Sequence, residues 1–109
     1  MSKYNYKVSI SPGKAFDIVK ENQSSELVHE EFFDLGEGRA IGTLVFEKYY
    51  FRASNRAALV VIIDNLKGTT EIRSVATGSS QGWLINFDWG AANDFAGSVR
   101  IGLENYIIE

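Results

Sequence analysis

The sequence predicts an α+β fold in which one antiparallel sheet of five strands, or six as an alternative, carries two helices on one face. Residues 42–65 contain two runs rich in β-branched and aromatic residues on either side of a polar Ser54-Asn55 break, which is typical of a hairpin. A helix start follows the first strand, and a second helical pattern ends the chain. Consecutive strands between two helices favour an antiparallel sheet, and the predicted element order is β-α-β-β-β-β-α.

Local signals mark the first strand and the first helix. Residues 3–10 alternate between polar and apolar side chains, which is the period of a strand with one buried face. Ser11 then offers an N-cap and Pro12 a first helical residue, where its missing N–H costs nothing. This pattern predicts a helix that ends near Asn22.

Residues 26–35 allow two interpretations. Val28 and Phe32 have the i, i+4 spacing of a helix, and Ser25 is a possible cap. The Gly36-Glu37-Gly38 break and the hairpin that follows favour a strand turning into the next one. We prefer the strand.

The next elements follow from composition and turn residues. The hairpin strands are expected over residues 40–53 and 56–65, and a turn at 65–68 lets Gly68 adopt a positive φ. Residues 69–77 read as another strand, and the short apolar stretch 83–87 is either a sixth strand or the approach to the last helix.

The C-terminal pattern predicts a helix that starts at Asp88 or Asn93 and runs nearly to the end of the chain. Its apolar stripe recurs every three or four residues, at Phe95, Val99, Leu103 and Tyr106 or Ile107.

Composition limits the class of protein. A chain of 109 residues predicts a single domain, residues 1–109. The net charge of −3 and the pI of about 5.2 argue against nucleic acid as a partner, because such proteins neutralise phosphates with a basic excess.

The absence of cysteine excludes disulfides and thiolate chemistry. The N-terminus alternates instead of forming the continuous apolar core of a signal peptide, and no apolar run approaches the ~18 residues of a membrane span. We therefore expect a soluble cytoplasmic protein without a membrane partner.

No strong catalytic or metal-binding pattern is present. The chain has one histidine, His29, and no nucleophile motif lies near it. His29 and Glu31 supply two metal ligands at most on one strand face, and a metal site needs three or four. Asp64 and Asp88 are better explained as a turn residue and a helix cap. The sequence thus predicts no enzyme, no metal site and no cofactor.

The hairpin carries the candidate interface. Both of its faces mix apolar and charged residues, so neither is plainly the core side, and two helices cover only one face of a sheet. An uncovered apolar face predicts a partner or self-association, and we expect a homodimer. The candidate interface residues are Tyr49, Tyr50, Phe51 and Arg52.

The alternative function is the binding of a small apolar or aromatic molecule between the C-terminal helix and the sheet. Two tryptophans and two phenylalanines lie within residues 83–95, and aromatic side chains commonly line ligand pockets. The candidate ligand-binding residues are Trp83, Phe87, Trp89 and Phe95.

The blocks Phe46-Glu47-Lys48-Tyr49-Tyr50-Phe51-Arg52 and Phe87-Asp88-Trp89-Gly90-Ala91, together with the length and element order, resemble a small bacterial family of unknown function. That resemblance implies no activity. The element order is also similar to helix-grip and TATA-box-binding-like folds, in which a curved antiparallel sheet holds a helix; this likeness concerns the fold alone.

Overall fold

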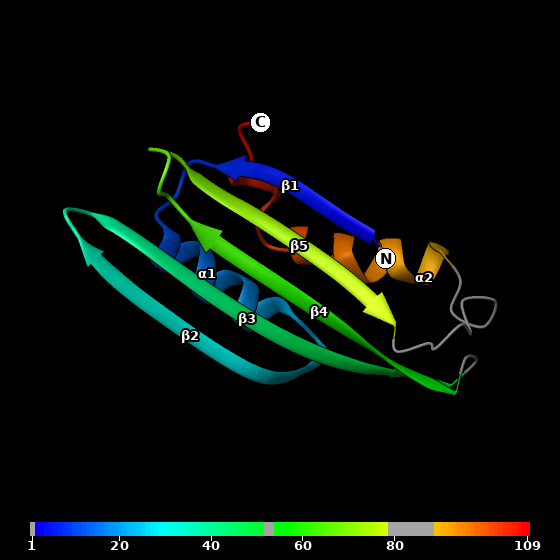
Figure 1. The fold of residues 1–109 in the computed structure, drawn as a ribbon. Helices are drawn as coiled ribbons and strands as arrows, with labels where there is room; N and C mark the ends of the chain where they lie inside the picture. The colour runs from blue at the N-terminus through cyan, green and yellow to red at the C-terminus, as the bar shows by residue number, and fades with distance from the viewer. Residues whose placement is uncertain (1, 52–53, 79–88) are drawn as a thin grey trace.

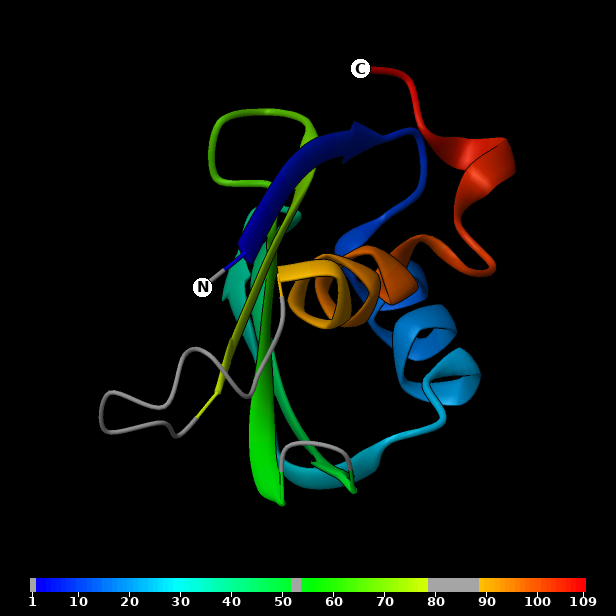
Figure 2. The ribbon, with the colours of Figure 1, turned by 90° about the vertical axis from the view of Figure 1, so that its right-hand side faces the viewer.

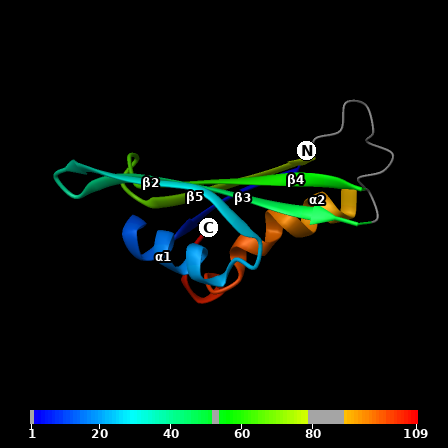
Figure 3. The ribbon, with the colours of Figure 1, turned by 90° about the horizontal axis from the view of Figure 1, so that it is seen from below.

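A single antiparallel sheet organises the chain in the computed structural model, which describes residues 2–51, 54–78 and 89–109. The five strands lie in the order β1-β5-β4-β3-β2. Both helices pack against the same face of this sheet, as Figure 3 shows. The predicted α+β class and the order β-α-β-β-β-β-α are confirmed. Residues 83–87, the alternative sixth strand, lie outside the described residues.

Four of the five strands form successive hairpins. Because β1 pairs with the outer side of β5, the N-terminal strand makes one edge of the sheet and β2 makes the other (Figure 1). Residues 26–35 are a strand, so the helical interpretation of this stretch is wrong. The strands are β1 (Ser2–Val8), β2 (Glu26–Gly36), β3 (Arg39–Tyr50), β4 (Asn55–Asp64) and β5 (Thr70–Gly78).

The first helix, α1 (Pro12–Asn22), has the predicted start and end. The Ser11 side chain accepts a hydrogen bond from the backbone N–H of Lys14 and so satisfies one of the free donors of the first turn. The buried stripe Ala15, Phe16 and Val19 faces the sheet.

The second helix, α2 (Trp89–Gly97), is shorter than predicted. Beyond Gly97 the chain forms two 3₁₀ turns, at Ser98–Arg100 and Glu104–Tyr106, so the prediction of one continuous helix is wrong. Asn93 lies inside α2, which rules out a start there, and Asp88 lies outside the described residues.

The conformation of Gly102 and the position of the C-terminus explain why the helix does not continue to the end of the chain. Gly102 has φ of +87°, a left-handed conformation that favours glycine and breaks an α-helix. The chain turns there and returns to the sheet, where Ile107 pairs with Val8 on the outer edge of β1. The apolar spacing nevertheless predicted the buried residues correctly, because Phe95, Val99 and Leu103 are all in the core.

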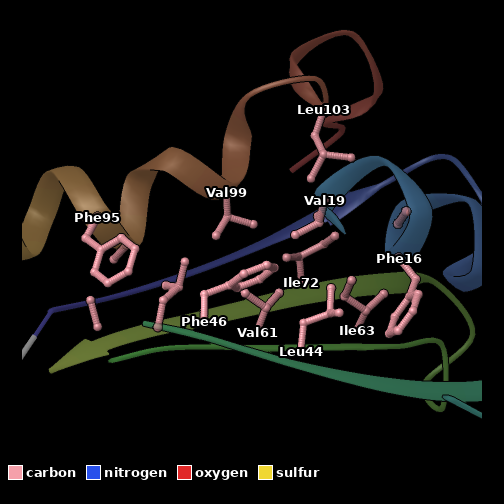
Figure 4. Packing of buried hydrophobic residues seen from close by; sticks show 14 of the residues in the cluster. Phe16, Val19, Leu44, Phe46, Val61, Ile63, Ile72, Phe95, Val99 and Leu103 are labelled. Carbon is pink, nitrogen blue, oxygen red and sulfur yellow. The ribbon is translucent and has the colours of Figure 1, made fainter. Parts of the chain in front are cut away.

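The core lies between the sheet and the two helices. Figure 4 shows Phe46, Leu44, Val61, Ile63 and Ile72 of the sheet facing Phe16 and Val19 of α1 and the stripe of Phe95, Val99 and Leu103. Even-numbered residues of β3 and odd-numbered residues of β4 therefore point to the helices. Figure 2, turned by 90°, shows both helices on one side of the sheet.

Candidate interaction surface

The face of the sheet that points away from the helices forms the candidate site, and we call it the open face. Its residues follow from strand alternation and from the register that pairs them across the sheet. They are Lys3, Asn5 and Lys7 of β1; Glu71, Arg73, Val75 and Thr77 of β5; Arg56, Ala58, Val60, Ile62 and Asp64 of β4; Arg39, Ile41, Thr43, Val45, Glu47 and Tyr49 of β3; and Glu26, His29, Glu31 and Phe33 of β2.

Apolar side chains occupy the middle of the open face. Val45, Val60 and Val75 lie directly opposite one another on the three central strands and are half-buried. Ile62 lies in the next row, and Phe33, which is 52% exposed, pairs with Ile41. No described helix covers these side chains, so they form a continuous apolar strip in contact with solvent.

The predicted interface residues do not all lie on one face, because successive residues of β3 point to opposite sides of the sheet. Tyr49 and Phe51 remain together in an edge-to-face contact with ring centroids 5.1 Å apart, and they are 44% and 86% exposed. Tyr50 lies on the helix side, where its ring contacts Phe95 at 6.1 Å and the Lys48 ammonium lies 5.4 Å from its centroid. Tyr50 is therefore not part of the open face, and Arg52 lies outside the described residues.

Paired charges border the apolar strip. The Asp64 carboxylate, in a residue only 4% exposed, accepts a 2.8 Å hydrogen bond from Arg73 and another from the backbone N–H of Leu66. The Arg73 side chain is 44% exposed, so the ion pair joins a buried carboxylate to a guanidinium in contact with solvent. The pair fixes the position of Arg73 beside Ile62 on the neighbouring strand.

His29 and Glu31 lie on one face of a strand, as the sequence predicts. They lie on the same face of the edge strand β2, with His29 Nε2 2.8 Å from a Glu31 carboxylate oxygen, and both side chains are exposed. The part of the chain that the structure describes contains no group of three or more His, Cys, Asp or Glu residues arranged to hold a metal ion.

The two edges of the sheet differ. The C-terminal tail covers part of the β1 edge, because the N–H of Lys7 donates to the Glu109 carbonyl and the N–H of Ile108 donates to the Lys7 carbonyl. A hydrogen bond from the Lys7 ammonium to the Glu109 carboxylate, 2.9 Å long, raises the pKa of Lys7. The β2 edge has two irregularities in its pairing with β3 and carries several carboxylates, features that discourage edge-to-edge association. The open face is therefore a better candidate for docking than either edge.

The predicted ligand site is only partly described. Trp83 and Phe87 lie outside the described residues, and Trp89 is described only as the first residue of α2. Phe95 is 3% exposed and fills the space between α2 and the sheet. Beside it lies a cleft of about 210 Å³, with a mixed polar and apolar lining of Gln23, Ser24, Lys48, Tyr50, Asp94, Phe95 and Ser98.

Sequence reasoning proposed Tyr49 and Phe51 as interface residues but did not propose the strip of Val60, Ile62 and Val75. The polar parity of β1, with Lys3, Asn5 and Lys7 on one face, was the available signal. The alternation on β1 shows which residues of β3 and β4 point away from the helices only when the register of the strands between them is known.

The fold and this surface define a small α+β protein with two helices on one face of its sheet and an uncovered apolar strip on the other. The chain belongs to a family of unknown function, DUF6054, whose sequence model matches residues 1–107. No curated protein and no solved structure matches the chain. Within the described residues, no helix is long and apolar enough to cross a membrane.

Proposed function

We propose that this protein is a non-enzymatic cytoplasmic interaction module that self-associates through the open face of its sheet. The observation that carries the proposal is the continuous strip of Val45, Val60, Val75 and Ile62 on the face opposite the helices. Antiparallel sheets commonly leave one face in water, with polar side chains along its strands, whereas the centre of this face is apolar. An apolar strip with a charged border is instead typical of a protein-binding surface. The absence of cysteine supports a reducing compartment.

The size of the open face is compatible with a dimer. Five strands spaced by ~4.8 Å and paired over ~30 Å give a face of roughly 700 Å². Stable interfaces of ordinary size bury about 800 Å² from each partner, so nearly the whole face would be used.

Sedimentation velocity between 1 µM and 1 mM tests the proposal, with Ile62→Glu as the disruptive variant. The new carboxylate lies beside Arg73 on β5, which helps the variant to fold, but it places a charge in the apolar strip. The wild type is expected to associate and Ile62→Glu to remain monomeric.

Ile101→Glu is the matched control. Ile101 is 51% exposed and follows the first 3₁₀ turn, on the helix side of the sheet, so the same substitution adds the same charge away from the open face. This variant should associate like the wild type. A wild type that stays monomeric at 1 mM, or an Ile62→Glu variant that associates normally, would overturn the proposal.

A second candidate function is the binding of a small apolar or aromatic molecule. It is favoured by the cleft of about 210 Å³ beside Phe95, between α2 and the end of β3, where the sequence predicts a ligand. Indole is a suitable aromatic probe, because a molecule that binds only the folded state raises Tm as its concentration increases. A Tm that does not change up to millimolar indole would argue against this function.

A further inference from the structure

Charged residues are segregated across the open face. On β1 and β5 basic residues outnumber acidic ones, whereas on β2 and β3 the reverse holds, and β4 lies between the two halves. The first half carries Lys3, Lys7 and Arg73 against Glu71, and the second half carries Glu26, Glu31 and Glu47 against Arg39.

Several of these charges are already paired within the chain, but one at each edge is not. Lys7 contacts Glu109, Arg73 contacts Asp64, and Glu31 contacts His29. Across residues 2–51, 54–78 and 89–109, neither Lys3 nor Glu26 has an ion-pair partner. Glu26 lies directly opposite Glu47 on β3, and because Glu47 already contacts Arg56, Glu26 is the member of this pair that is left for a cation from another chain.

One row of the open face crosses the whole sheet and connects its two edges. Lys3 pairs with Val75, Val75 with Val60, Val60 with Val45, and Val45 with His29. The row therefore begins with a cation, passes through three valines, and ends at a histidine that lies between Glu26 and Glu31 along the same face of β2.

We propose that the partner on the open face is a second copy of this chain, related by a two-fold axis that runs parallel to the strands over β4. This inference rests on the proposed function and specifies its geometry. A rotation about such an axis reverses the strand order and keeps each position along the strands. It therefore places β1 of one copy over β2 of the other, and β4 over β4.

Charge selects this axis over the other two-fold arrangement of stacked sheets. An axis perpendicular to the strands would place β1 over β1 and β2 over β2, so that the basic edge of the face would lie over a basic edge and the acidic edge over an acidic edge. Like charges across an interface are unfavourable, whereas opposite charges fix the register of association. With the parallel axis, Val60 lies over Val60, Val45 lies over Val75, and Lys3 of each copy lies over the acidic segment of β2 of the other.

Charge reversal at the two unpaired residues tests the geometry. Lys3→Glu alone and Glu26→Lys alone each place like charges at two symmetric positions in the dimer, and each should raise the dimer Kd roughly tenfold, an effect that salt reduces. An equimolar mixture of the two variants should form a heterodimer with a Kd close to that of the wild type, because opposite charges then meet at both positions.

The perpendicular axis gives a different result in the same experiment. Each single variant would then bind itself at least as tightly as the wild type, because reversal of one charge reduces the like charge on an edge that faces itself, and the mixture would bind no more weakly. That outcome overturns the inference while the proposed function stands, provided that Ile62→Glu still prevents association. A wild type that never associates overturns both.

A spin-label distance provides a second measurement. Because the chain has no cysteine, Lys3→Cys carries a single nitroxide in each copy. With the parallel axis the two β1 strands are separated by four strand spacings and one sheet spacing, which places their labelled backbones roughly 22 Å apart. With the perpendicular axis β1 lies over β1, so the labelled backbones are separated by the sheet spacing of roughly 10 Å and by a shift along the strands that is zero when the axis crosses β1 at residue 3. A distance near 10 Å contradicts the inference.

Discussion

Gly42 on β3 occupies a position where even a methyl group should destabilise the protein. It is buried on the helix side of the sheet, beneath the rings of Phe16 from α1 and Phe32 from β2, which contact each other edge to face with centroids 5.2 Å apart. A Cβ atom at Gly42 would lie 2.6 Å from one carbon of Phe16 and 2.8 Å from one carbon of Phe32. Both distances are well below van der Waals contact.

Two opposing effects determine the size of the change in Gly42→Ala. Alanine reduces the freedom of the unfolded chain, which favours folding by roughly 0.5–1 kcal/mol. Overpacking of a filled core costs about 1–3 kcal/mol. Phe32 is 40% exposed and has room to move, but Phe16 is 6% exposed and packs against the core, so we expect the steric cost to dominate. The net loss should be about 1–2 kcal/mol, or roughly 5–12 °C in Tm for a domain of this size.

The assay is thermal and urea unfolding of Gly42→Ala beside the matched control Gly13→Ala. Gly13 is the second residue of α1, and a Cβ there would meet Phe32 at an ordinary 3.8 Å. Alanine in a helix is favoured over glycine by up to ~1 kcal/mol, so the control should be as stable as the wild type or more stable. If Gly42→Ala unfolds within about 0.5 kcal/mol of the wild type, the argument from steric overlap is refuted.

Three further predictions concern buried polar groups. Burial raises the pKa of Tyr6 to about 12, so the Tyr6 hydroxyl keeps its proton to a higher pH in the folded state than in the unfolded state. The free energy of unfolding should therefore fall as the pH rises from ~10 towards 12. In Tyr6→Phe, the Tm values measured at pH 8 and pH 11 should differ less than in the wild type. The Ser74 hydroxyl donates to the carbonyl of Ala96 and joins β5 to α2; Ser74→Ala should cost about 1 kcal/mol in urea unfolding, and an unchanged midpoint would contradict this. Asp64→Ala removes the bonds to Arg73 and to the backbone, and a loss of about 1–3 kcal/mol is expected; a smaller loss would mean that Arg73 contributes little.

The sequence alone predicted the order of the main strands and helices. The Ser11-Pro12 start of α1, the strand alternation of residues 3–10 and the turn at Gly68, whose φ is +99°, depend on interactions within a few residues. Local signals of this kind do not require a knowledge of the fold. The same logic failed at the C-terminus, where the spacing of Phe95, Val99 and Leu103 correctly marked a buried stripe but not the turn at Gly102, which the return of the chain to β1 requires.

Only the tertiary structure decided which face of the hairpin is buried. Because both faces of residues 42–65 carry apolar side chains among charged ones, alternation alone cannot distinguish the core side from the solvent side. Packing of Phe16 and Phe95 against the even-numbered residues of β3 settles the choice, and it separates Tyr49 from Tyr50. The opposition of Lys3 and Glu26 at the two edges of one face likewise depends on strand order, which joins residues far apart in the sequence through pairings that no local pattern encodes.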